Sequence, residues 1–151
     1  MENILDGMKV LDLTRVLAGP YATMILADLG AEVIKVELPE VGDEARSFGP
    51  FQNGESAYFS SVNRGKKSIT IDLRTHRGGD IVRQLLKDCD VIVENFRPGS
   101  MDRFGLGYDQ LSHSHPHLVY ASISGFGQTG PYSPRGGFDL IACGMSGLMS
   151  I

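Results

Sequence analysis

The sequence has no long apolar run, no excess of positive charge and no recognisable export signal. None of its stretches approaches the roughly eighteen consecutive apolar residues of a membrane-spanning helix. Lysine and arginine number 14 against 18 aspartates and glutamates, and the net charge of -4 gives no reason to expect a nucleic-acid partner. The start, MENILDGMKV, lacks the charged and apolar regions of a signal peptide. We therefore expect a globular protein that meets neither a membrane nor nucleic acid.

The chain also has few residues arranged as metal ligands. Its two cysteines, Cys89 and Cys143, lie far apart and match no metal-binding spacing, so we expect reduced thiols in the cytoplasm. Histidines alternate at positions 113, 115 and 117 in SHSHPHL, a pattern that suggests a metal cluster. Pro116 and the expected turn favour a solvated loop instead, and we predict no metal.

Short strand-like and longer helix-like segments alternate along the chain. The segments MKVLDLT, AEVIKVE, KSITIDL, DVIVENF and HLVYASISGFG have the composition of buried strands. Helical periodicity lies between them in PYATMILADLG and RGGDIVRQLLKDC, and again in GFDLIACGMSGLM. This alternation predicts an α/β fold with an open parallel sheet, Rossmann-like, and helices on both faces. The length of 151 residues suits a single domain, residues 1–151.

Local signals refine these boundaries. Pro20 suits the first position of the first helix, and Gly30 suits the cap at its end. Asp139 suits a cap at the start of the last helix, where a carboxylate also meets the helix dipole favourably. The segment GSMDRFGLGYDQLSHSHP predicts two short helices. Residues 39–63 show no clear period, so we expect a long excursion over the surface or the active site.

Four loops should meet at one edge of this sheet, because ligands of open α/β sheets bind beyond the carboxyl ends of the strands. They are TRVLAGP, VELPEVGDEARSFGP, ENFRPGSMDR and SGFGQTGPYSPRGGFD. The third loop carries Asn95 for hydrogen bonds, Phe96 for stacking, and Arg97 and Arg103 for charge. The last is rich in glycine and suits a mobile cover or a plain connection.

The first loop lacks the glycines of a dinucleotide site. Such a site needs G-x-G-x-x-G, whereas this turn has only Gly19, so we expect no NAD. The run NRGKKS places Arg64, Lys66 and Lys67 before a strand. These three cations either meet a phosphate or form a solvated entrance to the strand.

Together these stretches resemble the family III CoA-transferases, which include formyl-CoA transferases, carnitine CoA-transferases and 2-methylacyl-CoA racemases. The resemblance covers essentially the whole chain. It rests on LDLTRVLAGPYATMILADLGAEVIKVE, SVNRGKKSITIDL, DVIVENFRPGSMDRFGLGY and SISGFGQTGPYSPRGGFDLIACGMSGLM. It implies that the domain binds coenzyme A and is the N-terminal part of a larger enzyme. The apolar end of the chain, without a cap or polar tail, fits that expectation.

The resemblance also implies which residues contact CoA. The first turn would border it with Leu17 and Ala18, and the loop comprising Arg135, Gly136, Gly137, Phe138 and Asp139 would border the thioester. The nucleotide part would meet Leu38, Ile71, Asp72, Leu73, Arg74, Asn95, Phe96, Arg97 and Arg103. Some family members have arginine where this chain has Leu38, and the cations of NRGKKS offer a substitute for it.

The implied activity is transfer of CoA from an acyl-CoA to a free carboxylic acid. In the family an aspartate forms an anhydride and then a thioester with CoA, and we expect that aspartate beyond Ile151, so no catalytic residue is assigned within this chain. Racemase relatives carry a histidine in GHD, where this chain has Phe138 in GFD, which favours a transferase. The alternatives are a racemase and a non-catalytic α/β binding or assembly module. The resemblance further implies an interlaced homodimer.

Overall fold

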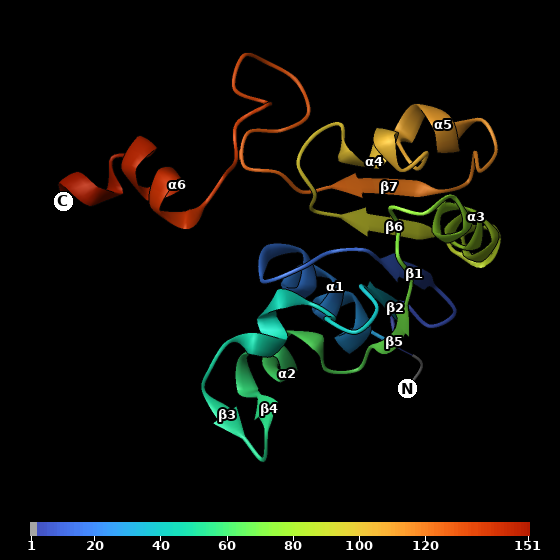
Figure 1. Cartoon of the computed structure of the whole chain (residues 1–151), viewed down its shortest axis with the longest axis horizontal. Coiled ribbons are helices and arrows are strands. Elements are labelled where there is room, and N and C mark those ends of the chain that lie inside the picture. Colours follow the sequence, from blue (N-terminus) through green and yellow to red (C-terminus); the bar gives the residue numbers. More distant parts are fainter. Residues whose placement is uncertain (1–2) are drawn as a thin grey trace.

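Five parallel strands form the central sheet of the protein (Figure 1). The computed structural model describes residues 3–151. The strands are β1 (Lys9–Asp12), β2 (Glu32–Glu37), β5 (Lys67–Thr70), β6 (Val91–Glu94) and β7 (Val119–Ser122). They lie side by side in the order β5-β2-β1-β6-β7, and every neighbouring pair is parallel. This order reverses between β1 and β6, as in Rossmann-like folds, and confirms the predicted open parallel sheet.

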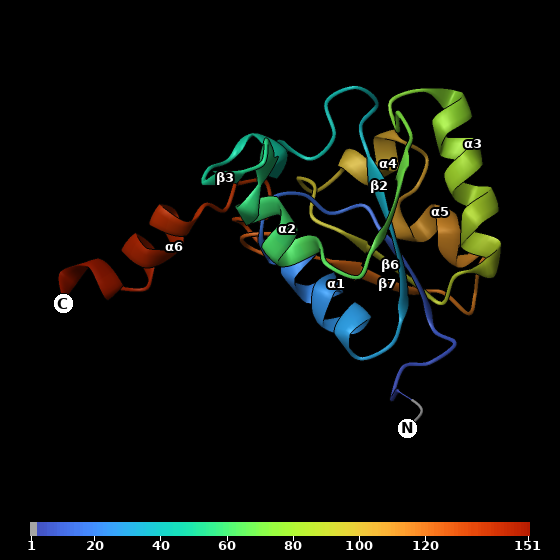
Figure 2. The ribbon, with the colours of Figure 1, turned by 90° about the horizontal axis from the view of Figure 1, so that it is seen from below.

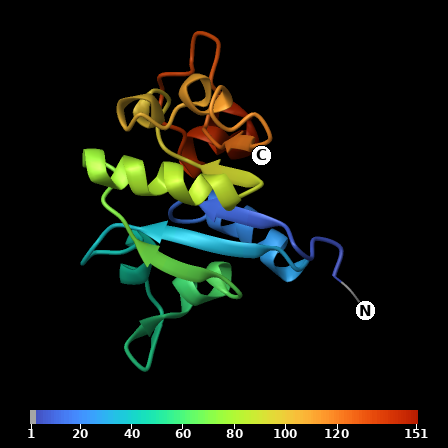
Figure 3. The same ribbon diagram turned by 90° about the vertical axis from the view of Figure 1, so that its right-hand side faces the viewer.

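Helices cover both faces of this sheet, as predicted. Figure 2 shows α1 (Ala18–Asp28) and α3 (His76–Leu85) on opposite sides of β2. The α3 side also carries η2 (Leu86–Asp88), α4 (Ser100–Arg103) and α5 (Tyr108–Ser112), whose residues join the larger apolar cluster. In Figure 3, helix α3 (yellow-green) packs over the sheet and runs nearly along the direction of β2 (cyan).

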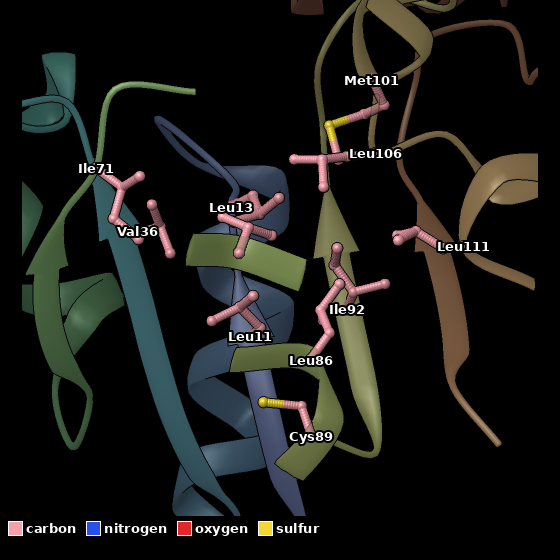
Figure 4. Packing of buried hydrophobic residues seen from close by; sticks show 11 residues of the cluster. Leu11, Leu13, Val36, Ile71, Leu86, Cys89, Ile92, Met101, Leu106 and Leu111 are labelled. Atoms are coloured by element: carbon pink, nitrogen blue, oxygen red, sulfur yellow. The ribbon is translucent and has the colours of Figure 1, made fainter. Parts of the chain in front are cut away.

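The core divides because successive strand residues point to opposite faces. Val10 and Val33 pack on the α1 side, while Leu11, Leu13 and Ile92 pack against α3 and its neighbours. Figure 4 shows the larger cluster, in which Leu86 and Cys89 lie close to the strands. The helical periodicity predicted for RGGDIVRQLLKDC is confirmed, and Val82 of α3 and Leu86 of η2 are fully buried against the sheet.

The ends of α1 follow from its sequence, with one correction. Helix α1 begins at Ala18, so Pro20 occupies its third position rather than its first. Proline is still tolerated there because the first four N–H groups of a helix have no intrahelical partner. Gly30 caps the other end as predicted: its φ is +105°, and the N–H groups of Gly30 and Ala31 bond back to Ala27 and Leu26.

Residues 39–63 contain more secondary structure than the sequence suggested. They form η1 (Glu44–Ser47), a hairpin of β3 (Phe51–Gln52) and β4 (Glu55–Ser56), and α2 (Ala57–Asn63). The elements are too short for a period to show in the sequence. Helix α2 packs against α1, so this segment is an integral layer of the domain.

The C-terminal segment lies apart from the sheet (Figure 1). It contains α6 (Asp139–Met145) and η3 (Leu148–Ser150), in which no residue is buried. Phe138 precedes α6 and makes no side-chain cap, so the expected Asp139 cap is wrong. Asp139 is the first helical residue, where its charge still meets the dipole. Across residues 3–151, no helix combines the length and the apolar character needed to cross a bilayer.

Candidate functional site

A cavity of about 320 Å³ lies where the strand order reverses, beyond the carboxyl ends of four strands. Residues that follow β1, β2, β5 and β6 form its walls. The lining residues are Leu13, Thr14, Arg15, Val36, Glu37, Leu38, Gly42, Asp43, Ile71, Asp72, Leu73, Arg74, Phe96, Ser100 and Phe104. Open α/β sheets bind their ligands at this place, which makes the cavity the candidate site.

Six of the predicted contact residues meet in this cavity. They are Leu38, Ile71, Asp72, Leu73, Arg74 and Phe96. Arg74 forms an ion pair with Asp72 at 2.8 Å, and its hydrogen bonds hold the pKa of the Asp72 carboxyl below its usual value. The pair keeps a guanidinium at the mouth of the cavity, where it can turn to meet an anionic ligand.

The Phe96 ring lines the cavity and contacts two neighbouring side chains, Phe104 and Arg15. Its ring packs edge-to-face against Phe104, with centroids 5.7 Å apart. The Arg15 guanidinium lies over the Phe96 ring at 4.8 Å from its centroid. A planar ligand can therefore meet both an aromatic surface and a cation here. Sequence reasoning missed Phe104, for which only its position after Arg103 gave a signal.

Asn95 has a different surrounding from the one expected of a ligand contact. Its side-chain oxygen accepts a hydrogen bond from the Arg15 N–H at 2.8 Å, and its side-chain N–H donates to the Arg15 carbonyl at 2.7 Å. Both polar ends of the amide are thus engaged by one residue of the β1–α1 turn. Asn95 fixes the shape of the turn from the β6 side.

Two further predicted arginines lie near the cavity but do not line it. Arg103 borders a neighbouring hollow of about 340 Å³, which shares Leu73, Arg74 and Phe104 with the cavity. Arg97 is exposed and approaches Gly136.

The remaining predicted contacts lie outside the cavity, and all of them except the half-buried Gly136 are exposed. Leu17 and Ala18 lie at the start of α1 with Leu17 48% exposed. Arg135, Gly136, Gly137, Phe138 and Asp139 follow a glycine-rich loop and are not among the lining residues. Gly125 and Gly137 touch at the base of that loop: a Cβ on either would lie 2.2 Å from the Cα of the other. Only glycine permits this close approach.

The cations of NRGKKS do not reach the cavity. Arg64 pairs with Asp28 on α1, and Lys67 pairs with Glu32 at the start of β2. Lys66 is almost completely buried and donates to Asp12, to the Pro20 carbonyl and to Asn63. Both readings of this run are therefore wrong for Lys66, which links α1, α2 and β1 inside the domain.

A network of buried charges lies beneath the cavity on the α1 side of the sheet. Lys35 on β2 is 1% exposed and pairs with Asp43 at 2.9 Å, while also donating to the Thr14 carbonyl at 2.8 Å. Lys66 pairs with Asp12 at 3.0 Å, and Asp12 also accepts from Thr14 and Thr23. Each charge has an opposite partner and further hydrogen bonds, as burial of a charge requires.

Glu37 is the third buried carboxylate of this region. Arg46 holds it with two hydrogen bonds of 2.7 Å, and Ser68 and the Asp43 N–H add two more. Burial pushes the pKa of Glu37 up, but these hydrogen bonds outweigh burial and lower it to about 2. The carboxylate therefore stays ionised at neutral pH and anchors the loop after β2. Arg46 also lies over the Phe59 ring of α2, 3.7 Å from its centroid.

Among residues 3–151, no three histidine, cysteine, aspartate or glutamate side chains gather as a metal site would require. His115 is buried rather than solvated, and its Nε2 lies 3.2 Å from the Arg83 carbonyl. The expectation of a solvated loop is thus wrong for His115, while His113 and His117 are exposed.

The fold is an open α/β domain with a cavity at the reversal of strand order. A likeness to a short chain dehydrogenase/reductase family protein, with a TM-score of 0.51 and 12% identity, extends to the fold alone. The family model of CoA-transferase family III matches residues 5–151. The chain belongs to this family, which confirms the predicted resemblance.

Individual relatives agree with this assignment. The chain is 59% identical over 148 residues to succinyl-CoA:glutarate CoA-transferase of Mus musculus, covering 97% of this chain and 34% of the relative. It is 50% identical to acetyl-CoA:oxalate CoA-transferase of Acetobacter aceti, covering 95% of this chain and 37% of the relative. A crystal structure of a CAIB/BAIF family protein from Brucella suis superposes with a TM-score of 0.93 at 49% identity, covering 100% of this chain and 41% of that chain. The chain thus spans about a third of the length of these curated relatives.

Proposed function

We propose that these residues are the CoA-binding N-terminal part of an enzyme that moves CoA from succinyl-CoA to a free dicarboxylic acid such as glutarate. The observation that carries this proposal is the 59% identity to the mouse succinyl-CoA:glutarate CoA-transferase over nearly the whole chain. Relatives that act on oxalate and mesaconate are similar at 50% and 48% identity, which keeps the acceptor within the class of small dicarboxylates.

The cavity at the carboxyl edge of the sheet favours the proposal that the nucleotide part of CoA binds there. The ligand would lie against Leu38, the residues from Ile71 to Arg74, and the Phe96 ring. Arg74, Arg97 and Arg103 would face its phosphates, since guanidinium groups suit phosphate oxygens. Leu17 and Ala18 would border the pantetheine arm, and the loop from Arg135 to Asp139 would border the thioester. Asn95 would act by holding the Arg15 backbone.

The chemistry requires a nucleophile that this sequence does not supply. An aspartate located after Ile151 would attack the thioester carbonyl and expel the CoA thiolate, which leaves a mixed anhydride. The thiolate would attack the aspartyl carbonyl, release succinate and leave an aspartyl-CoA thioester. The acceptor carboxylate and the thiolate would then repeat these two exchanges in reverse and release the new acyl-CoA. We also propose the interlaced homodimer of the family for the complete enzyme.

A labelling experiment tests the activity. The complete enzyme is incubated with succinyl-CoA and isotopically labelled glutarate, and thioesters are separated by chromatography. We expect label in glutaryl-CoA and an equal amount of free succinate. Deuterium entering an α-carbon of a 2-methylacyl-CoA without CoA exchange would instead identify a racemase, which the Phe138 position disfavours because its side chain cannot carry a proton.

A substitution in the cavity tests the site. Phe96→Ala removes the aromatic face and should weaken CoA binding about tenfold, which corresponds to 1.4 kcal/mol. Phe126→Ala is the matched control, because Phe126 packs against Tyr132 and does not line the cavity. Calorimetric titration with CoA measures both. Equal affinities of the two variants would contradict the placement of the nucleotide.

A further inference from the structure

The β1–α1 turn, residues 14–17, has an unusual backbone conformation. Val16 has φ +69° although its side chain is branched at Cβ. Such residues rarely adopt this left-handed conformation, and it persists only where surrounding groups hold it. Thr14 and Arg15 of the same turn line the cavity. The shape of one cavity wall therefore depends on whatever holds Val16.

The Asp43 carboxylate holds Val16 directly. It accepts the Val16 N–H at 3.1 Å to one oxygen and 3.3 Å to the other, and it also accepts the Ala45 N–H at 3.0 Å. Asp43 is 2% exposed, so water does not compete for these bonds. The carboxylate belongs to the loop after β2, which forms another wall of the same cavity.

Lys35 completes the connection between the two walls. Its ammonium pairs with Asp43 at 2.9 Å and donates to the Thr14 carbonyl at 2.8 Å. The two members of this buried ion pair thus bind the turn on either side of Arg15: Lys35 donates to the Thr14 C=O, and Asp43 accepts from the Val16 N–H. Asn95 binds the intervening Arg15 from the opposite side. Every one of these contacts is made to backbone, so they set the path of the turn.

We propose that Asp43, with Lys35, is a positioning residue that sets the β1–α1 turn for acyl-CoA and thereby determines the KM of the transferase for its thioester. The inference rests on the proposed function. Asp43 contacts no reacting atom in this role, because it acts through the backbone of Val16. Its loss lets Val16 relax to an ordinary negative φ, which moves the Arg15 wall of the cavity.

The test measures steady-state kinetics of the complete enzyme with succinyl-CoA and glutarate. Asp43→Asn keeps the size of the side chain but removes the charge that pairs with Lys35. We expect the KM for succinyl-CoA to rise at least tenfold, while kcat and the KM for glutarate change less than threefold. A variant with a lowered melting temperature but an unchanged KM for succinyl-CoA would overturn the inference.

A second substitution separates positioning from general support of the fold. Glycine adopts the Val16 conformation without penalty. Introducing Val16→Gly into the Asp43→Asn variant should return the KM for succinyl-CoA to within about threefold of wild type. Val16→Ala is the matched control and should give no recovery, since alanine shares the restriction on positive φ. Equal effects of the glycine and alanine substitutions would overturn the inference.

A replacement variant and a comparison with the wild-type enzyme allow the positioning role to be tested separately from folding and from the proposed function. If Asp43→Asn does not fold, the Lys35→Met/Asp43→Asn double variant replaces it, because neither partner then leaves an unpaired buried charge. The same tenfold rise in KM is expected, and an unchanged KM contradicts the inference. An inactive wild type that also fails to bind CoA in calorimetry would overturn the proposed function itself. An active wild type with unaffected variants would overturn only the positioning role.

Discussion

Near the carboxyl edge of the strands, the two faces of the sheet are held by different contacts, although both faces carry an apolar cluster. On the α3 side, Leu11, Leu13 and Ile92 meet Leu86 in an apolar cluster. On the α1 side near the carboxyl edge, the alternate strand positions are Asp12, Lys35 and Glu37, all buried. Both faces border the cavity, with Glu37 and Asp43 from the charged face and Leu13, Val36 and Ile71 from the apolar cluster. The charged groups also bond to the backbone of the cavity loops. From this difference we infer that the apolar cluster mainly stabilises the packing of the sheet, whereas the buried charges mainly fix the conformation of the loops.

The physical reason is the directionality of the contacts. Apolar burial depends on area and tolerates small displacements of the partners. A buried charge tolerates none, because each charge must keep an opposite partner and its hydrogen bonds. Loops that must hold one conformation for a ligand are therefore better fixed from the charged face. Four experiments address this comparison, in order of decreasing expected effect.

Breaking a buried pair on the charged face should have the largest effect on stability. Asp12→Asn leaves the Lys66 ammonium buried without a carboxylate, which should cost about 3–5 kcal/mol in the free energy of unfolding. Urea denaturation measures this cost. The Asp12→Asn/Lys66→Met double variant should recover part of it, because no charge then remains unpaired. A double variant with a lower free energy of unfolding than Asp12→Asn would show that the packing of the Lys66 side chain matters more than the pairing of its charge.

Truncation on the apolar face should cost a similar or slightly smaller amount. Leu86 is fully buried, and Leu86→Ala should lower the free energy of unfolding by about 2–5 kcal/mol through lost transfer energy and a cavity. Val41→Ala, at a position 64% exposed, should change it by no more than about 0.5 kcal/mol. The activity of folded Leu86→Ala should stay near that of wild type, because the loops are fixed from the other face.

Acid should weaken the charged face selectively. The folded pKa of Glu37 is about 2 against an ordinary value of 4.5, so its contribution is present above pH 4.5 and is lost as pH falls toward 2. The difference corresponds to about 3 kcal/mol at neutral pH. Glu37→Gln should therefore lower the melting temperature at pH 7. The melting temperature of this variant should also fall less steeply than that of wild type between pH 4.5 and pH 2. Glu40→Gln, at an exposed position, should leave the slope unchanged.

The smallest effect should come from a surface pair. Arg64 and Asp28 are 55% and 43% exposed, so Arg64→Ala should change the free energy of unfolding by less than about 1 kcal/mol. Salt should reduce even this difference. A loss as large as that of Asp12→Asn would mean that exposure is a poor guide to these pairs.

The residues that the sequence placed correctly are those with strong local signals. Periodicity located the five strands of the parallel sheet and the helix α3 between them, and Gly30 marked the end of α1. The candidate site was predicted in part: Leu38, Phe96 and the residues from Ile71 to Arg74 do meet in one cavity. Lys66 and His115 were misread, because hydrogen-bond partners distant in sequence engage them. Asn95 bonds to the distant Arg15 backbone, which the sequence did not indicate, and its contact with CoA stays a prediction.

The sequence by itself determined the strand and helix periods, the sheet class and the family, because local propensity and long motifs do not depend on distant contacts. Only the tertiary structure decided that Lys35 and Asp43 join two walls of the cavity, and that Val16 adopts a left-handed conformation between them. The identity of a lysine in a strand does not reveal whether its side chain is exposed or buried. Its burial, and the carboxylate that makes burial tolerable, arise only when the loops fold back over the sheet.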